Sequence, residues 1–168
     1  MVRFHFSLDD LAQTRFAISP MWELITGLRA LRDPARAALH LPWVAQALPI
    51  ARELDLGGAL ALTPPEGYMP DFLTPPPSGP LASFEDELEL VRSTPEAQVV
   101  ADVESLYRCG HGSDRISVFL ERPKPEVERM CEALAQFWKL ALEPHWPRVR
   151  ALLEDGRRAR LTRRVRAC

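Results

Sequence analysis

The longest stretch with a single hydrophobic period covers residues 125–153. Apolar side chains recur along its first part at the spacing of one helix face: Val127, Met130, Cys131, Leu134, Phe137, Trp138 and Ala141. Polar residues occupy the opposite face, so the pattern predicts an amphipathic helix that buries an aromatic stripe. Pro144 and Pro147 interrupt this helix. Because proline is tolerated in the first turn of a helix, a second helix is expected to begin near Pro144.

Capping residues and prolines mark the starts of shorter helices upstream. A serine, threonine or aspartate directly before a proline combines an N-cap side chain with a favoured first-turn residue. These signals and the apolar spacing predict helices over residues 20–32, 34–39, 41–54 with a kink at Pro49, 84–92 and from 95 onward. Asp155 and Gly156 are expected to end the last helix.

Three short segments favour other structures. Residues 2–6 alternate between apolar and polar, which predicts one strand, and Ser7 then caps a helix over residues 8–16. The apolar run 59–62 is either a strand or a linker, and the state of the β-prone run 116–120 stays open. The predicted fold is mainly α, a bundle of about eight mostly short helices with one N-terminal β-strand and a long proline-rich loop.

Residues 63–80 form that loop. They contain seven prolines and two glycines, a composition that excludes a helix or a central strand. Tyr68, Met69, Phe72 and Leu73 are too apolar for a free linker, so the loop is expected to pack on the domain. It either covers a groove or serves as a rigid surface connector.

Composition and charge narrow the class of protein. The 168 residues suffice for one domain with a tail, and no apolar run reaches the roughly 18 residues of a membrane span. The first residues lack the apolar core of a signal peptide. Three scattered cysteines favour a reduced, cytoplasmic chain over a disulfide framework.

The arginines gather near the C-terminus. Residues 148–168 carry eight arginines against two acidic residues, although the whole chain has a net charge of −2, so the remainder is acidic. We divide the chain into a helical domain, 1–154, and an arginine-rich tail, 155–168. The tail either contacts nucleic-acid backbone without sequence specificity or is a solvated, disordered segment. The contacts would come from Arg157, Arg158, Arg160, Arg163, Arg164 and Arg166.

No constellation of catalytic residues emerges from the sequence. Cys109 and His111 stand close enough to begin a metal site, but no second pair of ligands has a fitting spacing. The acidic residues at 85–89 suit the start of a helix, and neither a phosphate-binding glycine loop nor a nucleophile elbow is present. We therefore expect no enzyme, no metal and no cofactor.

Four stretches in order carry a family resemblance: RFAISPMWEL at 15–24, ALHLPWV at 38–44, GYMPDFLTPPPSGPLASFEDEL at 67–88 and EPHWPRVRALLE at 143–154. They resemble the N-terminal region of a group of actinobacterial ArsR-type transcriptional regulators, in which a winged helix-turn-helix follows. The resemblance implies a cytoplasmic, dimeric, repressor-like regulator. In such a regulator this region senses an effector or assembles the dimer.

The chain departs from that family after residue 154, where residues 157–168 differ from the expected continuation. The recognition helix that would enter the major groove is missing, so no DNA-reading or metal-sensing residue is carried over. The first hypothesis for the function is thus that the chain is the sensing or assembly domain of such a regulator, without its winged helix. The alternative is a free-standing protein–protein interaction module that forms mixed dimers with a full-length regulator.

The resemblance also frames the expected partners. A homodimer or a mixed dimer is expected, with a small-molecule effector that favours one arrangement of the winged domains. Large side chains near the proline-rich segment are the candidates to line an effector groove: Trp22, Trp43, Tyr68, Phe72 and Trp146.

Overall fold

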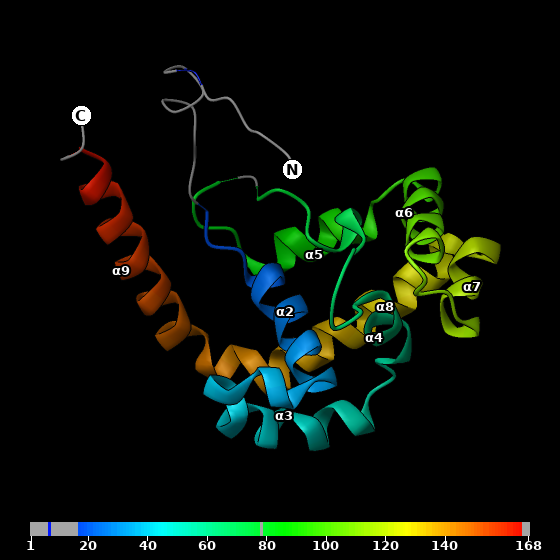
Figure 1. Ribbon diagram of the computed structural model, residues 1–168, viewed down its shortest axis with the longest axis horizontal. Helices are drawn as coiled ribbons and strands as arrows, with labels where there is room; N and C mark the ends of the chain where they lie inside the picture. The colour runs from blue at the N-terminus through cyan, green and yellow to red at the C-terminus, as the bar shows by residue number, and fades with distance from the viewer. Residues whose placement is uncertain (1–6, 8–16, 78, 166–168) are drawn as a thin grey trace.

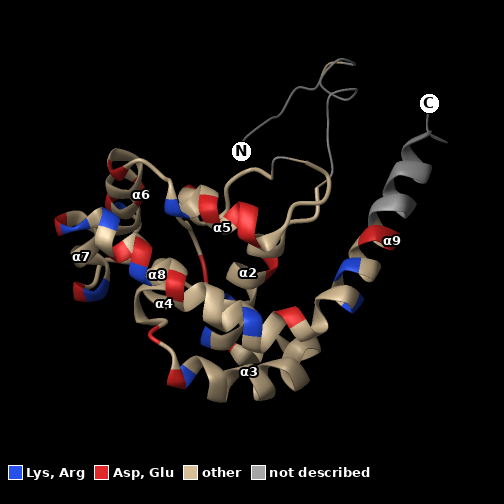
Figure 2. Cartoon of the chain, turned by 180° about the vertical axis from the view of Figure 1, so that it is seen from behind, with Lys and Arg blue, Asp and Glu red and all other residues tan. Residues whose placement is uncertain are grey.

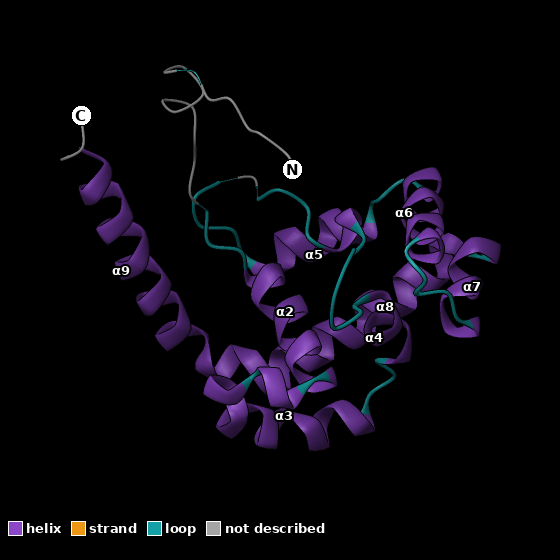
Figure 3. Ribbon diagram, viewed as in Figure 1, coloured by secondary structure: helices purple, strands orange, loops and turns teal. Residues whose placement is uncertain are grey.

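The computed structural model describes residues 7, 17–77 and 79–165, and within them the chain is mainly helical (Figures 1 and 3). The predicted strand 2–6 and the predicted helix 8–16 lie outside the described residues. The elements in order are α2 (Pro20–Arg32), η1 (Pro34–Arg36), η2 (Ala38–His40), α3 (Leu41–Glu53), α4 (Gly57–Leu62), η3 (Asp71–Leu73), α5 (Phe84–Arg92), α6 (Glu96–Arg108), α7 (Asp114–Glu121), α8 (Pro123–Phe137), η4 (Trp138–Leu142), η5 (Glu143–His145) and α9 (Trp146–Val165).

The predicted helix starts are confirmed where a side chain caps the helix. The backbone N–H of Trp22 donates to Oγ of Ser19 at 2.9 Å, and that of Asp86 donates to Oγ of Ser83 at 3.1 Å. Each bond satisfies an N–H group that the first turn of a helix leaves without a backbone partner. Pro49 lies inside α3, which continues past it to Glu53.

Two apolar runs are helical. The expectation of a strand or a linker at 59–62 is wrong, because these residues belong to α4, where Ala59 and Leu62 are buried. The open run 116–120 belongs to α7, whose Ile116 and Phe119 are buried three residues apart. Short apolar runs carry no period that separates a helix from a strand, so the packing against α8 decides their structure.

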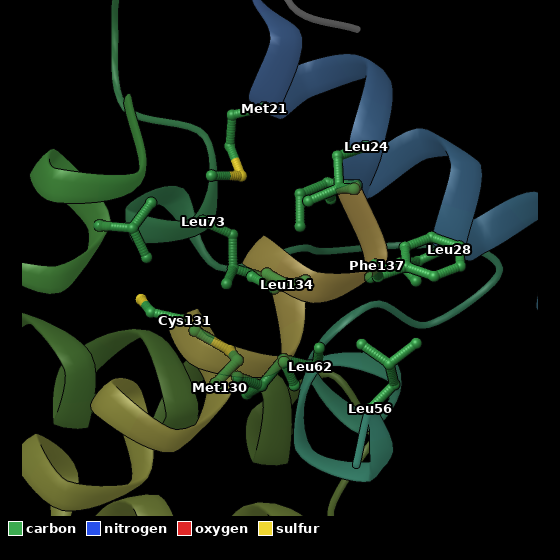
Figure 4. Packing of buried hydrophobic residues seen from close by; sticks show 14 of the residues in the cluster. Met21, Leu24, Leu28, Leu56, Leu62, Leu73, Met130, Cys131, Leu134 and Phe137 are labelled. Carbon is green, nitrogen blue, oxygen red and sulfur yellow. The ribbon is translucent and has the colours of Figure 1, made fainter. Parts of the chain in front are cut away.

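The long amphipathic helix is confirmed as α8, the centre of the hydrophobic core (Figure 4). Met130, Leu134 and Phe137 of α8 meet the buried side chains of α2 and α4. Cys131 packs there as a small apolar residue, and burial raises the pKa of its thiol to about 11. Stacking one amphipathic helix against several others buries all of their apolar faces at once.

The chain changes its helical geometry between α8 and α9. η4 is a π-helical turn in which the N–H of Glu143 donates to the carbonyl of Trp138, and η5 is a 3-10 turn that contains Pro144. A proline cannot donate its nitrogen to the helix and displaces the preceding turn, which accounts for the break. The predicted second helix follows as α9. Its predicted end at Asp155 and Gly156 is wrong, because α9 continues to Val165.

The proline-rich loop packs on the domain, as predicted. Phe72 and Leu73 of η3 are buried in the core, and the loop ends where the N–H of Ile18 donates to the carbonyl of Pro80 at 3.1 Å. Ile18 and Leu81 form an isolated parallel bridge there. Gly67, inside the loop, has a positive φ of 81°, a backbone conformation that favours glycine.

Candidate functional site

The aromatic residues predicted to line one groove fall into two groups. Tyr68 and Phe72 lie in the proline-rich loop, and both bind Asp102 of α6. The Tyr68 hydroxyl donates to Oδ1 at 3.2 Å, and the Phe72 N–H donates to Oδ2 at 3.0 Å. Burial and the charges of Asp102 and Asp71 raise the pKa of Tyr68 to about 12. These contacts anchor the loop to α6.

Trp43 and Trp146 form the second group, at the C-terminal end of α8. The indole N–H of Trp43 donates to the carbonyl of Ala141 at 2.9 Å, and its ring meets Phe137 edge-on with centroids 6.5 Å apart. Trp146 meets Trp138 edge-on at 5.3 Å. Both indoles are half-buried. These partners fix the end of α8 and the start of α9, and a role of the two tryptophans in binding an effector stays a prediction.

Trp22 belongs to neither set of contacts, and 49% of its surface is exposed on α2. Large exposed apolar side chains also occur after α8, where Leu140 of η4 is 55% exposed and Leu152 of α9 is 65% exposed. No residue between Pro147 and Gly156 is buried. α9 rises away from the other helices, so its far end stands well apart from α2 and α5 (Figure 1).

The arginine-rich segment lies on the second half of α9. The backbone there is helical to Val165, which places Arg157, Arg158, Arg160, Arg163 and Arg164 on a continuous helix. Arg166 lies outside the described residues. Contact of these arginines with nucleic-acid backbone stays a prediction.

A cavity that the sequence did not reveal lies between the start of α4 and the helices α7 and α8. Its volume is about 190 Å³. Its lining combines charged residues at the rim with apolar residues and two glycines: Asp55, Gly57, Gly58, Arg115, Val118, Phe119, Glu126, Arg129 and Met130. The sequence feature that could have indicated this cavity is the glycine pair at 57 and 58. Adjacent glycines allow a close approach of another side chain to the backbone, as well as a break in the chain.

Glu126, at the N-terminal end of α8, is buried and paired. Its Oε1 accepts from Nη2 of Arg122 at 2.9 Å and from Nη2 of Arg129 at 3.4 Å. Burial of a carboxylate is tolerable when cations and hydrogen bonds compensate its lost hydration. This pairing holds Arg129 beside the cavity.

A second buried carboxylate, Glu87 of α5, joins two helices. Its Oε2 accepts from the N–H of Met21, in the first turn of α2, at 2.8 Å. Burial raises the pKa of the Glu87 carboxyl, while the Met21 bond and a bond with Ser19 oppose that rise. The acidic residues at the start of α5 otherwise face solvent (Figure 2). The role of Glu87 is thus to cap α2 from a neighbouring helix.

The metal-site alternative gains no support from the geometry. Cys109 is exposed, and the side chain of His111 lies against Gly67 of the proline-rich loop. Among the residues that the structure describes, no group of three histidine, cysteine or acidic side chains is placed to hold a metal ion. In the same part of the chain, no helix has both the length and the apolarity needed to cross a membrane.

Comparisons with protein-family models, with curated proteins and with solved structures gave no match to this chain.

Proposed function

We propose that this chain is the N-terminal sensing or assembly domain of a cytoplasmic transcriptional regulator of ArsR-like type, without the DNA-reading winged helix. One structural observation supports assembly most strongly: α9 is a 20-residue helix whose described side chains up to Gly156 include no buried residue. Most helical stability in proteins comes from packing an apolar face rather than from the helix propensity of the residues alone. We therefore expect another protein surface to cover α9 and to stabilise it.

The proposed cover is a second copy of the chain. Leu140 of η4 and Leu152 of α9 are exposed leucines on either side of η5, and a symmetric contact that includes both would bury each side chain twice. Within α9, Trp146 packs against Trp138 at the first turn, and Nε of Arg150 lies 2.8 Å from Oε1 of Glu154. Such an exposed pair adds only about 0.3–0.5 kcal/mol.

The connection between α8 and α9 supports the sensing part of the proposal. η4 and η5 replace regular α-helical bonds at this point, and Trp146 at the start of α9 contacts Trp138 of η4. A π-helical turn that joins a buried helix to an uncovered one is a natural hinge. An effector that shifts α8 within the core would redirect α9, and through it the partner that supplies the winged helix missing from this chain.

The experiment that tests this function is DNA cross-linking in the cells that produce the protein. The protein, tagged at its N-terminus and expressed from its own locus, is cross-linked to DNA, purified and sequenced. Because this chain lacks the recognition helix, enrichment at a small set of promoters is expected only through a DNA-reading partner that it assembles with, and the Leu152→Glu variant should lose it. Equal recovery of DNA across the genome would contradict the proposal. Promoter enrichment by a chain that is monomeric when pure would favour the alternative, a module that pairs with another regulator.

A further inference from the structure

The outer face of α3 is exposed and carries no charge. This name refers to the four exposed residues that recur at the spacing of one helix face, on the side away from the buried Val44 and Ala47: Pro42, Ala45, Gln46 and Pro49. The sequence has no aspartate, glutamate, lysine or arginine between Arg36 and Arg52, although 26% of the chain is charged. Figure 2 accordingly shows α3 without a charged residue until its C-terminal end.

Two leucines extend this uncharged surface at the start of α3. Leu39 of η2 is 93% exposed, and Leu41, the first residue of α3, is 47% exposed. Single exposed apolar side chains are common on protein surfaces, but several that follow one another indicate a site of interaction with another molecule. The outer face of α3, together with these leucines, is therefore a candidate docking surface.

The absence of charge on this surface narrows the kind of molecule that covers it. Nucleic-acid backbone is bound by lysine and arginine side chains. Helices that lie on a membrane surface carry the same two residues beside their apolar side chains. The outer face of α3 has neither residue, so its composition fits a protein surface rather than a nucleic acid or a membrane.

The size of a stable protein interface points to a second copy of this chain. Such an interface takes about 20–30 residues from each partner. The uncovered helix α9 has 20 residues and presents only one side to a partner, so α9 and Leu140 alone fall short of that number. The outer face of α3, on a helix of 13 residues, and the three residues of η2 supply the missing part.

Both uncovered helices are attached to η4. The indole N–H of Trp43 in α3 donates to the carbonyl of Ala141 at 2.9 Å, and Trp146 at the start of α9 meets Trp138. α9 rises away from α3, so it does not cover the α3 of its own chain (Figure 1). In a dimer with two-fold symmetry, however, a contact of α9 with the partner's α3 recurs as the contact of α3 with the partner's α9.

We propose that α9 of each copy lies on the outer face of α3 of the other copy. The exposed side of α9 has the same helical spacing, with an apolar middle and charged ends: Arg148, Ala151, Leu152 and Asp155. Ala151 and Leu152 pack against Ala45, whose small side chain lets the two helices approach closely. The charged ends stay hydrated at the rim of the interface. This inference rests on the proposed function, because it names the surface that covers α9.

The Ala45→Glu variant tests whether α3 belongs to the interface. It places a charge at the centre of the outer face, and because Ala45 is exposed and glutamate is a good helix former, far-ultraviolet circular dichroism should be unchanged. Light scattering during size-exclusion chromatography should give the mass of one chain for Ala45→Glu. Ala97→Glu, the same change at an exposed position of α6, should keep the mass of two. Leu39→Ser should raise the dissociation constant of the dimer about 10-fold.

A mixture of two variants tests the exchange of α9 and α3. Ala45→Glu damages only α3 and Leu152→Glu damages only α9, so in a dimer of either variant both contacts between α9 and α3 are damaged. A mixed dimer keeps one contact intact, between the unchanged α9 of one chain and the unchanged α3 of the other. An equimolar mixture of the two monomeric variants should therefore recover dimers. A dimer that pairs α3 with α3 and α9 with α9 would have no intact contact in this mixture.

The outcomes distinguish this inference from the proposed function. A dimeric Ala45→Glu protein would overturn the inference, leave the α9 interface standing and assign the outer face of α3 to a different protein or to a membrane. A mixture that stays monomeric would likewise overturn the exchange of α9 and α3 alone. A wild type that is itself monomeric would overturn both this inference and the assembly of two copies.

Discussion

Trp43 of α3 meets Gly27 of α2 edge-on, so closely that a Cβ atom on the glycine would lie 2.9 Å from Cη2 of the indole. The opposite end of the indole is fixed, because its N–H donates to the carbonyl of Ala141 in the π-helical turn. One tryptophan therefore ties α2 and α3 to the hinge between α8 and α9. This contact needs a glycine in the middle of a helix, where glycine is otherwise unfavourable.

The Gly27→Ala substitution should destabilise the protein. At an open position in a helix this change stabilises by about 1 kcal/mol, but here the new methyl group meets an indole that cannot move away, and overpacking costs about 1–3 kcal/mol. A net loss is expected, measured as a lower midpoint in urea unfolding. Gly79→Ala is the matched control, since a Cβ atom there meets nothing within 4 Å. A Gly27→Ala protein as stable as the wild type would show that Trp43 is loosely held.

Asp102 should hold the proline-rich loop on the domain. Asp102→Ala removes the acceptor of both Tyr68 and Phe72 and leaves the Phe72 N–H without its partner, a loss of about 1–3 kcal/mol. Limited proteolysis within residues 64–80 should accelerate, together with a lower urea midpoint. Glu104→Ala changes an exposed carboxylate on the same helix and should do neither. Equal cleavage of the two variants would contradict the anchoring role.

Glu87 should make the stability depend on pH. Burial raises the folded-state pKa of this carboxyl above its ordinary value of 4.5, so the folded protein holds the proton more tightly than the unfolded chain does. The associated stability is complete below 4.5 and is lost as the pH rises through the folded-state pKa. Glu87→Gln stays neutral and keeps an acceptor for the N–H of Met21. Its free energy of unfolding should therefore increase relative to that of the wild type as the pH rises through the folded-state pKa.

The measurement for Glu87 is urea unfolding of the wild type and Glu87→Gln at a series of pH values from acid to neutral. Subtracting the unfolding free energies of the two proteins removes the contributions of the other titrating groups, which both proteins share. Glu85→Gln, which changes an exposed residue of α5, serves as the control and should show a nearly constant difference. If the wild type instead became more stable relative to Glu87→Gln as the pH rises, the burial argument would be contradicted.

The parts of the fold that the sequence predicts well rest on neighbouring residues. Ser19 and Ser83 cap helices through bonds to N–H groups three residues away, so capping chemistry alone locates those starts. The apolar face of α8 recurs over many residues, and its period is unambiguous. Gly156 does not end α9 as expected. One glycine inside a helix costs only about 1 kcal/mol, which is too little to end a helix that has good helix formers on both sides.

The candidate sites could not be predicted because they join distant residues. The bond between Glu87 and Met21 spans 66 positions, and nothing near either residue in the sequence indicates it. The cavity likewise combines residues from the start of α4, from α7 and from α8. The five predicted groove residues were chosen for size and for closeness to the proline-rich loop. Neither criterion predicts that Asp102 binds Tyr68 in the loop, or that Trp43 binds the chain just after α8.

The central claim is that α9 and the leucines beside it form an interface between two copies of this chain. Its most direct test is the molar mass in solution, measured by light scattering during size-exclusion chromatography for the wild type and for Leu152→Glu. The wild type should have twice the mass of one chain and Leu152→Glu the mass of one, whereas Leu90→Glu, which changes an exposed leucine of α5, should remain a dimer. A wild type that stays monomeric at every concentration tested would contradict the claim.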